Sequence, residues 1–290
     1  MSTAETRVSS KLLRTLRDLN TIDLLRASGL AGLAKTWPEV HRFFDGPSLV
    51  LARKLAVFDE RLGQGEIRGA ALGLLADLGT RVRFWGPAPA LSGPRLFLAN
   101  HPGLGDVLAL LSLLGKDDLK IIARERPFLQ ALPNLIPSLF LVPERNSWTV
   151  LRRVESHLAG GGAVLTFPAG RIEADPAWAD PSASWDLWSA STAFWARRIP
   201  SLVVQPLLVS GVRARAFVDP WAARWRRNPE DRDWTAAVLQ LVFQLLWGRP
   251  RTSRIDVAVG ETLPGTVLAG SEGGLRLKAS LKNMAAVSRR

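Results

Sequence analysis

The sequence contains no cysteine and no tyrosine, and only three of its 290 residues are histidines. Without cysteine the chain cannot form disulfide bonds, zinc–thiolate sites or a thiol nucleophile. Any reaction that needs an imidazole must use His41, His101 or His157. We expect neither a bound metal ion nor a cofactor.

Long hydrophobic runs are also missing. The longest apolar stretches, "VLALLSLLG" and "AAVLQLVFQLLWG", fall short of the roughly 20 residues that a membrane-spanning helix needs. The first 20 residues hold no apolar core of signal-peptide length. The sequence therefore predicts a soluble or peripheral protein in the cytoplasm.

Lysine is scarce, yet the chain is strongly basic. Only seven of the 38 basic residues are lysines, and the formal net charge is +12. Arginine binds phosphate in a bidentate manner, so this surplus favours nucleic acid, acidic lipid headgroups or phosphorylated substrates as partners. Nucleic-acid binding has only the charge in its favour, because no binding module is recognisable, and we expect no nucleic-acid partner. The serine-hydrolase elbow and the Walker-type glycine loop are absent too.

The chain changes character near residue 80. Residues 10–79 have helical spacing of apolar side chains, which predicts an N-terminal helical unit over residues 1–80. Seven short β-like runs then alternate with helical stretches: "RVRFWG", "RLFLAN", "LKIIAR", "SLFLVP", "AVLTFP", "LVVQPLLVSG" and "RIDVAVG". This alternation predicts an α/β domain over residues 81–290, with a mixed, largely parallel sheet flanked by helices and functional loops at the strand ends.

The segment "NHPGLGD" holds His101 and Asp106 between a predicted strand and a predicted helix. On a continuous helix, residues five apart would lie about 140° apart around the axis, so the two side chains can meet only across a turn. Pro102, Gly103 and Gly105 supply the residues for that turn. Asp106 could then fix the tautomer of the imidazole and leave its other nitrogen as a base. Alternatively, Asp106 is an ordinary helix cap and His101 a satisfied loop residue.

Four segments in order give this pair a context. "NHPGLGD" resembles the first conserved block of the phospholipid/glycerol acyltransferase family, which includes 1-acylglycerol-3-phosphate acyltransferase. "LFLVPERN", with Arg145, is similar to the second block. "LTFPAGRIE" resembles the third block at Phe167, Pro168 and Gly170, and "VVQPLLVSG" resembles the fourth.

The resemblance implies an O-acyltransferase of phospholipid biosynthesis. It would move a fatty acyl group from acyl-CoA or acyl-carrier protein to a hydroxyl of a glycerol-phosphate type acceptor such as lysophosphatidate. His101 would be the general base, oriented by Asp106. Arg145 and Arg171 would bind the acceptor phosphate, and Phe167, Pro168 and Gly170 would line the substrate site. The backbone amides of Gly103 and Gly105 could stabilise an oxyanion or bind a phosphate.

The third block departs from the family pattern. Ala169 stands where the family has glutamate, and Arg171 precedes Ile172 where the family has Thr-Arg. The segment is closer to the "P-S-G-G-R" of soluble plastid-type glycerol-3-phosphate acyltransferases. An alternative follows: a peripheral lipid-binding protein of the same fold that has lost turnover.

Tryptophan is concentrated in the C-terminal half, where eight of the 11 lie between Trp178 and Trp247. Trp185, Trp188 and Trp195 form one helical stripe that we expect to be core. Trp221 and Trp225 stand among arginines, a composition typical of membrane interfaces. We expect peripheral attachment to an anionic membrane, on the inner face.

Overall fold

The computed structural model describes residues 9–90, 92–144, 147–185, 188, 191–247, 253–270 and 272–288. Its helices are α1 (Ser10–Ser28), α2 (Pro38–Gly63), α3 (Ile67–Asp77), α4 (Asp106–Leu114), α5 (Pro127–Gln130), α6 (Trp148–Ala159), α7 (Ser182–Trp185), α8 (Ser191–Arg198), α9 (Pro229–Trp247), α10 (Gly265–Ala269) and α11 (Gly273–Ser288). Its strands are β1 (Thr80–Trp85), β2 (Arg95–Ala99), β3 (Leu119–Arg124), β4 (Leu139–Val142), β5 (Ala163–Thr166), β6 (Val203–Ser210), β7 (Ser253–Val259) and β8 (Leu263–Pro264).

The N-terminal region folds into α1, α2 and α3, as its apolar spacing predicts. Gly29, with a φ of 73°, ends α1 in the left-handed conformation that glycine adopts without strain. Pro38 occupies the first turn of α2, where the missing N–H costs nothing. α3 ends at Asp77 and β1 begins at Thr80, so helices give way to alternating elements at this point in the chain. The division into units at residue 80 stays a prediction.

The sheet confirms the predicted fold class. All seven β-like runs form strands, in the order β1-β7-β6-β2-β5-β3-β4, and the short β8 pairs with β6. The pairs from β6 through β4 are parallel, whereas β7 runs antiparallel to β6 and β1 runs parallel to β7. The sheet is therefore mixed and largely parallel.

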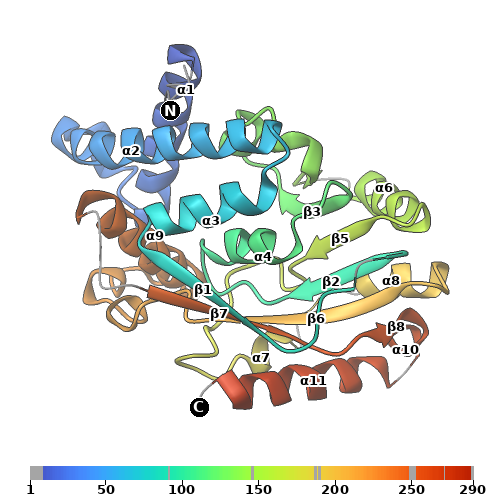
Figure 1. The fold of residues 1–290 in the computed structure, drawn as a ribbon. Coiled ribbons are helices and arrows are strands. Elements are labelled where there is room, and N and C mark those ends of the chain that lie inside the picture. The colour runs from blue at the N-terminus through green and yellow to red at the C-terminus, as the bar shows by residue number, and fades with distance from the viewer. Residues whose placement is uncertain are drawn as a thin grey trace.

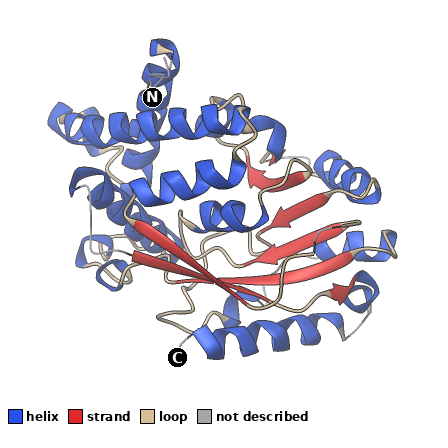
Figure 2. Ribbon diagram, in the orientation of Figure 1, coloured by secondary structure: helices blue, strands red, loops and turns tan. Residues whose placement is uncertain are grey.

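Helices cover both faces of the sheet (Figures 1 and 2). One buried cluster joins Phe97 and Leu165 of the sheet to Ala56 of α2 and Leu75 of α3. The alternate residues of the same strands, Leu96 and Val164 among them, belong to a second cluster with residues of α6, α8 and α11. Because side chains alternate along a strand, each strand contributes to both cores. The N-terminal helices thus share one core with the sheet.

The C-terminal tail is helical, whereas the single helical stripe expected for Trp185, Trp188 and Trp195 is interrupted. The tail forms α11. Residues 182–198 do not form one continuous helix, because Trp188 lies outside both α7 and α8. Trp185 and Trp195 are nevertheless 3% and 1% exposed, which confirms that they are core residues.

The topology brings three loops to one edge of the sheet. β2 lies between β5 and β6 and is parallel to both, so the carboxyl ends of these strands lie at the same edge. The residues that follow them include "NHPGLGD" after β2, "FPAGRIE" after β5 and "GVRAR" after β6. Parallel strands place their functional loops at this edge.

Candidate active site

The bend after β2 is fixed to the neighbouring strand by Asn100. The buried Asn100 side chain donates to the carbonyl of Val209 on β6 (2.8 Å) and accepts from the Val209 N–H (2.7 Å). The bend itself packs tightly, since a Cβ on Gly103 would meet Val212 Cγ1 at 2.7 Å, and one on Gly105 would meet Ile255 Cδ1 at 3.0 Å. Glycine is needed at Gly103 and favoured at Gly105 because a larger residue would collide with the sheet and the segment after β6.

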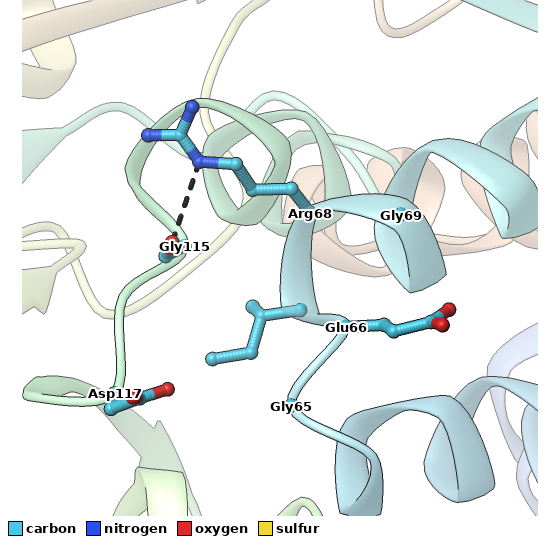
Figure 3. Close-up of a pocket in the computed structure, with 7 residues that line it drawn as sticks. Gly65, Glu66, Arg68, Gly69, Gly115 and Asp117 are labelled. Atoms are coloured by element: carbon cyan, nitrogen blue, oxygen red, sulfur yellow. Dashed lines mark hydrogen bonds between the residues drawn. The ribbon is translucent and has the colours of Figure 1, made fainter.

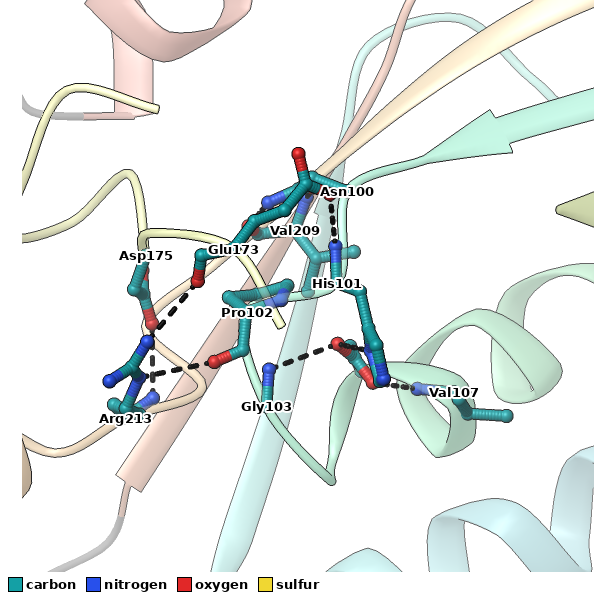
Figure 4. Close-up of polar contacts among 10 residues, drawn as sticks. Asn100, His101, Pro102, Gly103, Val107, Glu173, Asp175, Val209 and Arg213 are labelled. Atoms are coloured by element: carbon teal, nitrogen blue, oxygen red, sulfur yellow. Dashed lines mark hydrogen bonds and ion pairs between the residues drawn. The ribbon is translucent and has the colours of Figure 1, made fainter. Parts of the chain in front are cut away.

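The turn brings His101 and Asp106 together. His101 Nδ1 lies 2.7 Å from Asp106 Oδ2, and Asp106 is completely buried in the first turn of α4. The same carboxylate accepts the N–H groups of Gly103 (3.2 Å) and Val107 (2.7 Å) (Figure 4). Asp106 therefore accepts hydrogen bonds on both oxygens. With Nδ1 donating to Asp106, His101 Nε2 is left as the acceptor nitrogen.

Burial and charge act in opposite directions on the imidazole. Burial lowers the pKa of His101, but the charge and hydrogen bond of Asp106, with the charge of Glu173, outweigh it and raise the pKa above its ordinary value of 6.5. The surroundings of His101 thus favour the imidazolium. A base must become an imidazolium when it takes a proton, so this environment suits a general base.

Glu173, in the loop after β5, forms a two-sided contact with His101. Its N–H donates to the His101 carbonyl (2.8 Å), and its carboxylate Oε2 accepts the His101 N–H (3.0 Å). Oε1 accepts the indole N–H of Trp188 (3.1 Å). Burial outweighs the hydrogen bonds from Trp188 and from the His101 N–H, so the pKa of Glu173 is raised above its ordinary value.

A buried arginine joins all three loops. Arg213, 4% exposed, donates to the carbonyls of Pro102 and Glu173, both at 3.2 Å, and pairs with Asp233 of α9 at 2.6 Å. Asp175 accepts the N–H groups of Ala177 (3.0 Å), Gly211 (2.8 Å) and Arg213 (3.0 Å). Burial raises the pKa of Asp175 above its ordinary value, although these three hydrogen bonds lower it. The loops after β2, β5 and β6 therefore hold one another in place.

The residues predicted to bind the substrate lie at different distances from His101, and one of them is outside the described residues. The Phe167 ring lies 4.8 Å from the His101 ring, centroid to centroid, and Pro168 after it is buried. Gly170, with a φ of 65°, and the exposed Arg171 follow in a turn closed by the Gly170 N–H on the Phe167 carbonyl (3.0 Å). Arg145 lies outside the described residues.

Two features of the site could not be read from the sequence. The amide of Gly103 serves the Asp106 carboxylate in the structure. The sequence pattern does not mark Glu173, Asp175 or Arg213 as site residues. Glu173 lies within the third block, so its proximity to the motif was the only signal. Asp175 and Arg213 belong to no motif.

Two pockets in the structure contain neither His101 nor Asp106 in their lining. One, of about 300 Å³, is lined by residues at the start of α3 and by Gly115 and Asp117, where Arg68 Nε donates to the Gly115 carbonyl (3.4 Å) (Figure 3). It lies beyond the far end of α4, and nine residues at 1.5 Å each span about 14 Å. This hollow is therefore remote from Asp106.

The second hollow is an apolar groove of about 610 Å³ between α2, α9 and residues 216–224. Four exposed side chains lie in or beside it: Phe43 (60% exposed), Trp221 (83%), Trp225 (53%) and Leu246 (42%). Arg224, also in its lining, pairs with Asp219 at 2.9 Å. The groove thus combines apolar side chains with a polar margin.

Within the described ranges, no group of three or more histidine, aspartate or glutamate side chains could hold a metal ion. Nor do those ranges contain a helix with the length and hydropathy to cross a bilayer.

No protein-family model matches the chain, and no curated protein matches it. Among solved structures, the chain is similar to the crystal structure of the 1-acyl-sn-glycerophosphate (LPA) acyltransferase PlsC from Thermotoga maritima. The likeness covers 96% of this chain and 95% of that chain, with 15% sequence identity and a TM-score of 0.49.

Proposed function

We propose that the protein is an O-acyltransferase that moves a fatty acyl group from a thioester, acyl-CoA or acyl-carrier protein, to a hydroxyl of a glycerol-phosphate type acceptor. The observation that carries the proposal is the His101–Asp106 pair, with Nδ1 and Oδ2 at 2.7 Å, at the carboxyl edge of the sheet. The pair is buried on the Asp106 side and 23% exposed on the His101 side, so a substrate can approach the imidazole. The four sequence segments support the same reaction.

The proposed step begins at the acceptor hydroxyl. His101 Nε2 takes its proton while the hydroxyl oxygen attacks the thioester carbonyl carbon, and Asp106 stabilises the imidazolium. The tetrahedral intermediate then breaks its C–S bond, and the departing sulfur receives the proton from His101. The products are an ester and a free thiol, and the imidazole is again neutral.

The acceptor phosphate is assigned to arginine. We propose that Arg171, exposed in the turn after Phe167, and Arg145 bind it through charge-assisted hydrogen bonds. Phe167, Pro168 and Gly170 form the wall of the site next to His101. The amide of Gly105, just before α4, is proposed to help stabilise the oxyanion, with the positive end of the helix dipole behind it; the Gly103 amide, the other candidate, is already donated to Asp106.

The groove between α2 and α9 is the proposed contact with an anionic membrane, on the inner face. Trp221 and Phe43 would enter the headgroup region, and the exposed Arg42 and Arg227 would meet acidic lipids. Such a contact gives a soluble fold access to an acceptor that resides in the bilayer.

Acyl transfer by the purified protein tests the reaction. Acyl-CoA and acyl-carrier protein would each be offered with lysophosphatidate, other lysophospholipids and glycerol 3-phosphate, and ester and free thiol would be measured. We expect turnover with a phosphorylated acceptor and its loss in His101→Ala. Turnover that survives His101→Ala would refute the assignment of the base. Lipid binding without turnover by any donor would favour the inactive lipid-binding alternative.

Liposome sedimentation tests the membrane contact. We expect Trp221→Ser to weaken binding to acidic vesicles about tenfold, since the indole no longer enters the interface. Trp148→Ser is the matched control, because Trp148 is 64% exposed on α6, which contributes no residue to the lining of the groove. Equal losses in the two variants, or no preference for acidic lipid, would refute the contact.

A further inference from the structure

Glu173, in the loop after β5, contacts the proposed base. The third block has Ala169 where the resembling family has glutamate, yet a carboxylate four residues later reaches the base. Glu173 is 2% exposed, and its main chain and side chain both contact the backbone of His101. A buried carboxylate is costly unless it is hydrogen-bonded, and both oxygens of Glu173 accept N–H groups.

The charges around Glu173 come from each element packed against it. His101 in the bend after β2 and Asp106 at the start of α4 both act on it: the charge of His101 lowers the pKa of Glu173, and the charge of Asp106 raises it. Arg213 binds the main-chain carbonyl of Glu173 and also pairs with Asp233 of α9. Among the described residues, no lysine or arginine forms an ion pair with the Glu173 carboxylate. Within that part of the chain, the two carboxylate oxygens are satisfied by the N–H groups of His101 and Trp188 and not by an ion pair.

We propose that Glu173 is a positioning residue for His101: it clamps the backbone of the base from both sides and, as a second carboxylate beside Asp106, favours the imidazolium. The proposal rests on the proposed function for its catalytic meaning, since a base must be held at its substrate and must become positively charged. The clamp consists of two hydrogen bonds, at 2.8 and 3.0 Å, that close a ring between residues 101 and 173. The charge of Glu173 also contributes to the raised pKa of His101.

Glu173→Gln removes the charge and keeps the size. The glutamine oxygen can accept the His101 N–H, but its amide N–H₂ then faces the Trp188 indole N–H, donor against donor. Trp188→Phe removes that conflict. The test therefore compares wild type with E173Q, and W188F with E173Q/W188F. Glu66→Gln is the matched control, because Glu66 pairs with Arg61 at 2.9 Å at the remote hollow.

Two measurements are made on each variant. The pKa of His101 is read by NMR titration of the imidazole signals, which are few because the chain has three histidines. The pH profile of kcat/KM is read by acyl transfer. In each pair we expect the Gln variant to show a lower His101 pKa, an acidic limb moved to lower pH and a kcat reduced about tenfold. The Glu66→Gln variant should match wild type.

The outcomes separate the two proposals. Folded E173Q, or folded E173Q/W188F beside W188F, with an unchanged His101 pKa and an unmoved acidic limb would overturn the role of Glu173, even if kcat fell. A lower His101 pKa in a protein that transfers no acyl group would uphold the electrostatic role of Glu173 and refute the proposed function.

Discussion

Asp106→Asn tests the proposed base most directly, because the substitution preserves shape and removes only charge and acceptor capacity. Asp106 is fully buried and accepts three N–H groups, from His101, Gly103 and Val107. Asparagine has one acceptor oxygen. If that oxygen faces His101, the amide faces the Val107 N–H; if it faces Val107, the amide faces His101 and Gly103.

The magnitude follows from these two arrangements. Each leaves at least one buried N–H unpaired, at about 1–3 kcal/mol, so we expect a loss of unfolding free energy of that size. The arrangement that turns the amide toward His101 also inverts the tautomer and places a proton on Nε2, where the base should be. A serine protease with the equivalent Asp→Asn change loses about 10⁴ in kcat, and we expect a loss of about 10³–10⁴ here, or about 4–5.5 kcal/mol.

Two assays decide the outcome. Urea unfolding followed by tryptophan fluorescence gives the stability, and initial rates of thiol release give kcat. Asp117→Asn makes the same chemical change at an exposed residue beyond the other end of α4 and should alter neither quantity. If Asp106→Asn retained more than about a tenth of wild-type kcat in a folded protein, the orienting role of Asp106 would be refuted.

Three further predictions concern the surroundings of this pair. Asp175→Ala leaves three N–H groups without an acceptor, one buried and two partly buried, and we expect it to lower the unfolding free energy in urea by about 1–3 kcal/mol, with Asp175→Asn costing less; equal effects would contradict this account. Gly103→Ala should cost about 1–3 kcal/mol through its contact with Val212, and Val212→Ala should recover part of that loss in the double variant. Because the pKa of folded His101 is raised above 6.5, the acidic limb of kcat/KM should lie above that pH. The same shift contributes stability that is complete below pH 6.5 and is lost as pH rises through the folded pKa, a loss that His101→Gln should remove from the stability profile.

The sequence predicts those parts of the site that lie close together along the chain. The β-like runs predicted the strands, and the glycines and proline between His101 and Asp106 predicted a turn that brings the two together. These features depend on local pattern and turn chemistry, which a sequence shows directly. The strand order, with β7 antiparallel to β6, depends on long-range packing and could not be predicted from the runs alone.

The contacts that support the site could not be predicted either, because they join residues that lie far apart in the sequence. Glu173 meets His101 across 72 residues, and Arg213 meets Pro102 across 111. Nothing in the local sequence distinguishes these charged residues from solvated ones. The predicted stripe of Trp185, Trp188 and Trp195 is not one helix, because Trp188 lies outside both α7 and α8 and its indole donates to Glu173. Its expected burial was correct for Trp185 and Trp195.

The hydrogen bonds of Arg213, Asp175 and Glu173, which hold the loops after β2, β5 and β6 together, affect the conformational entropy of the site. A bend rich in glycine loses much conformational freedom when it is ordered, because glycine has the most backbone states to lose. Here the chain orders that bend as it folds, because the side chains of Glu173 after β5 and Arg213 after β6 hydrogen-bond to the backbone of His101 and Pro102. In the proposed reaction, a bound substrate would therefore meet a base that is already immobilised, and its binding energy would not be reduced by the need to freeze the loop in every cycle.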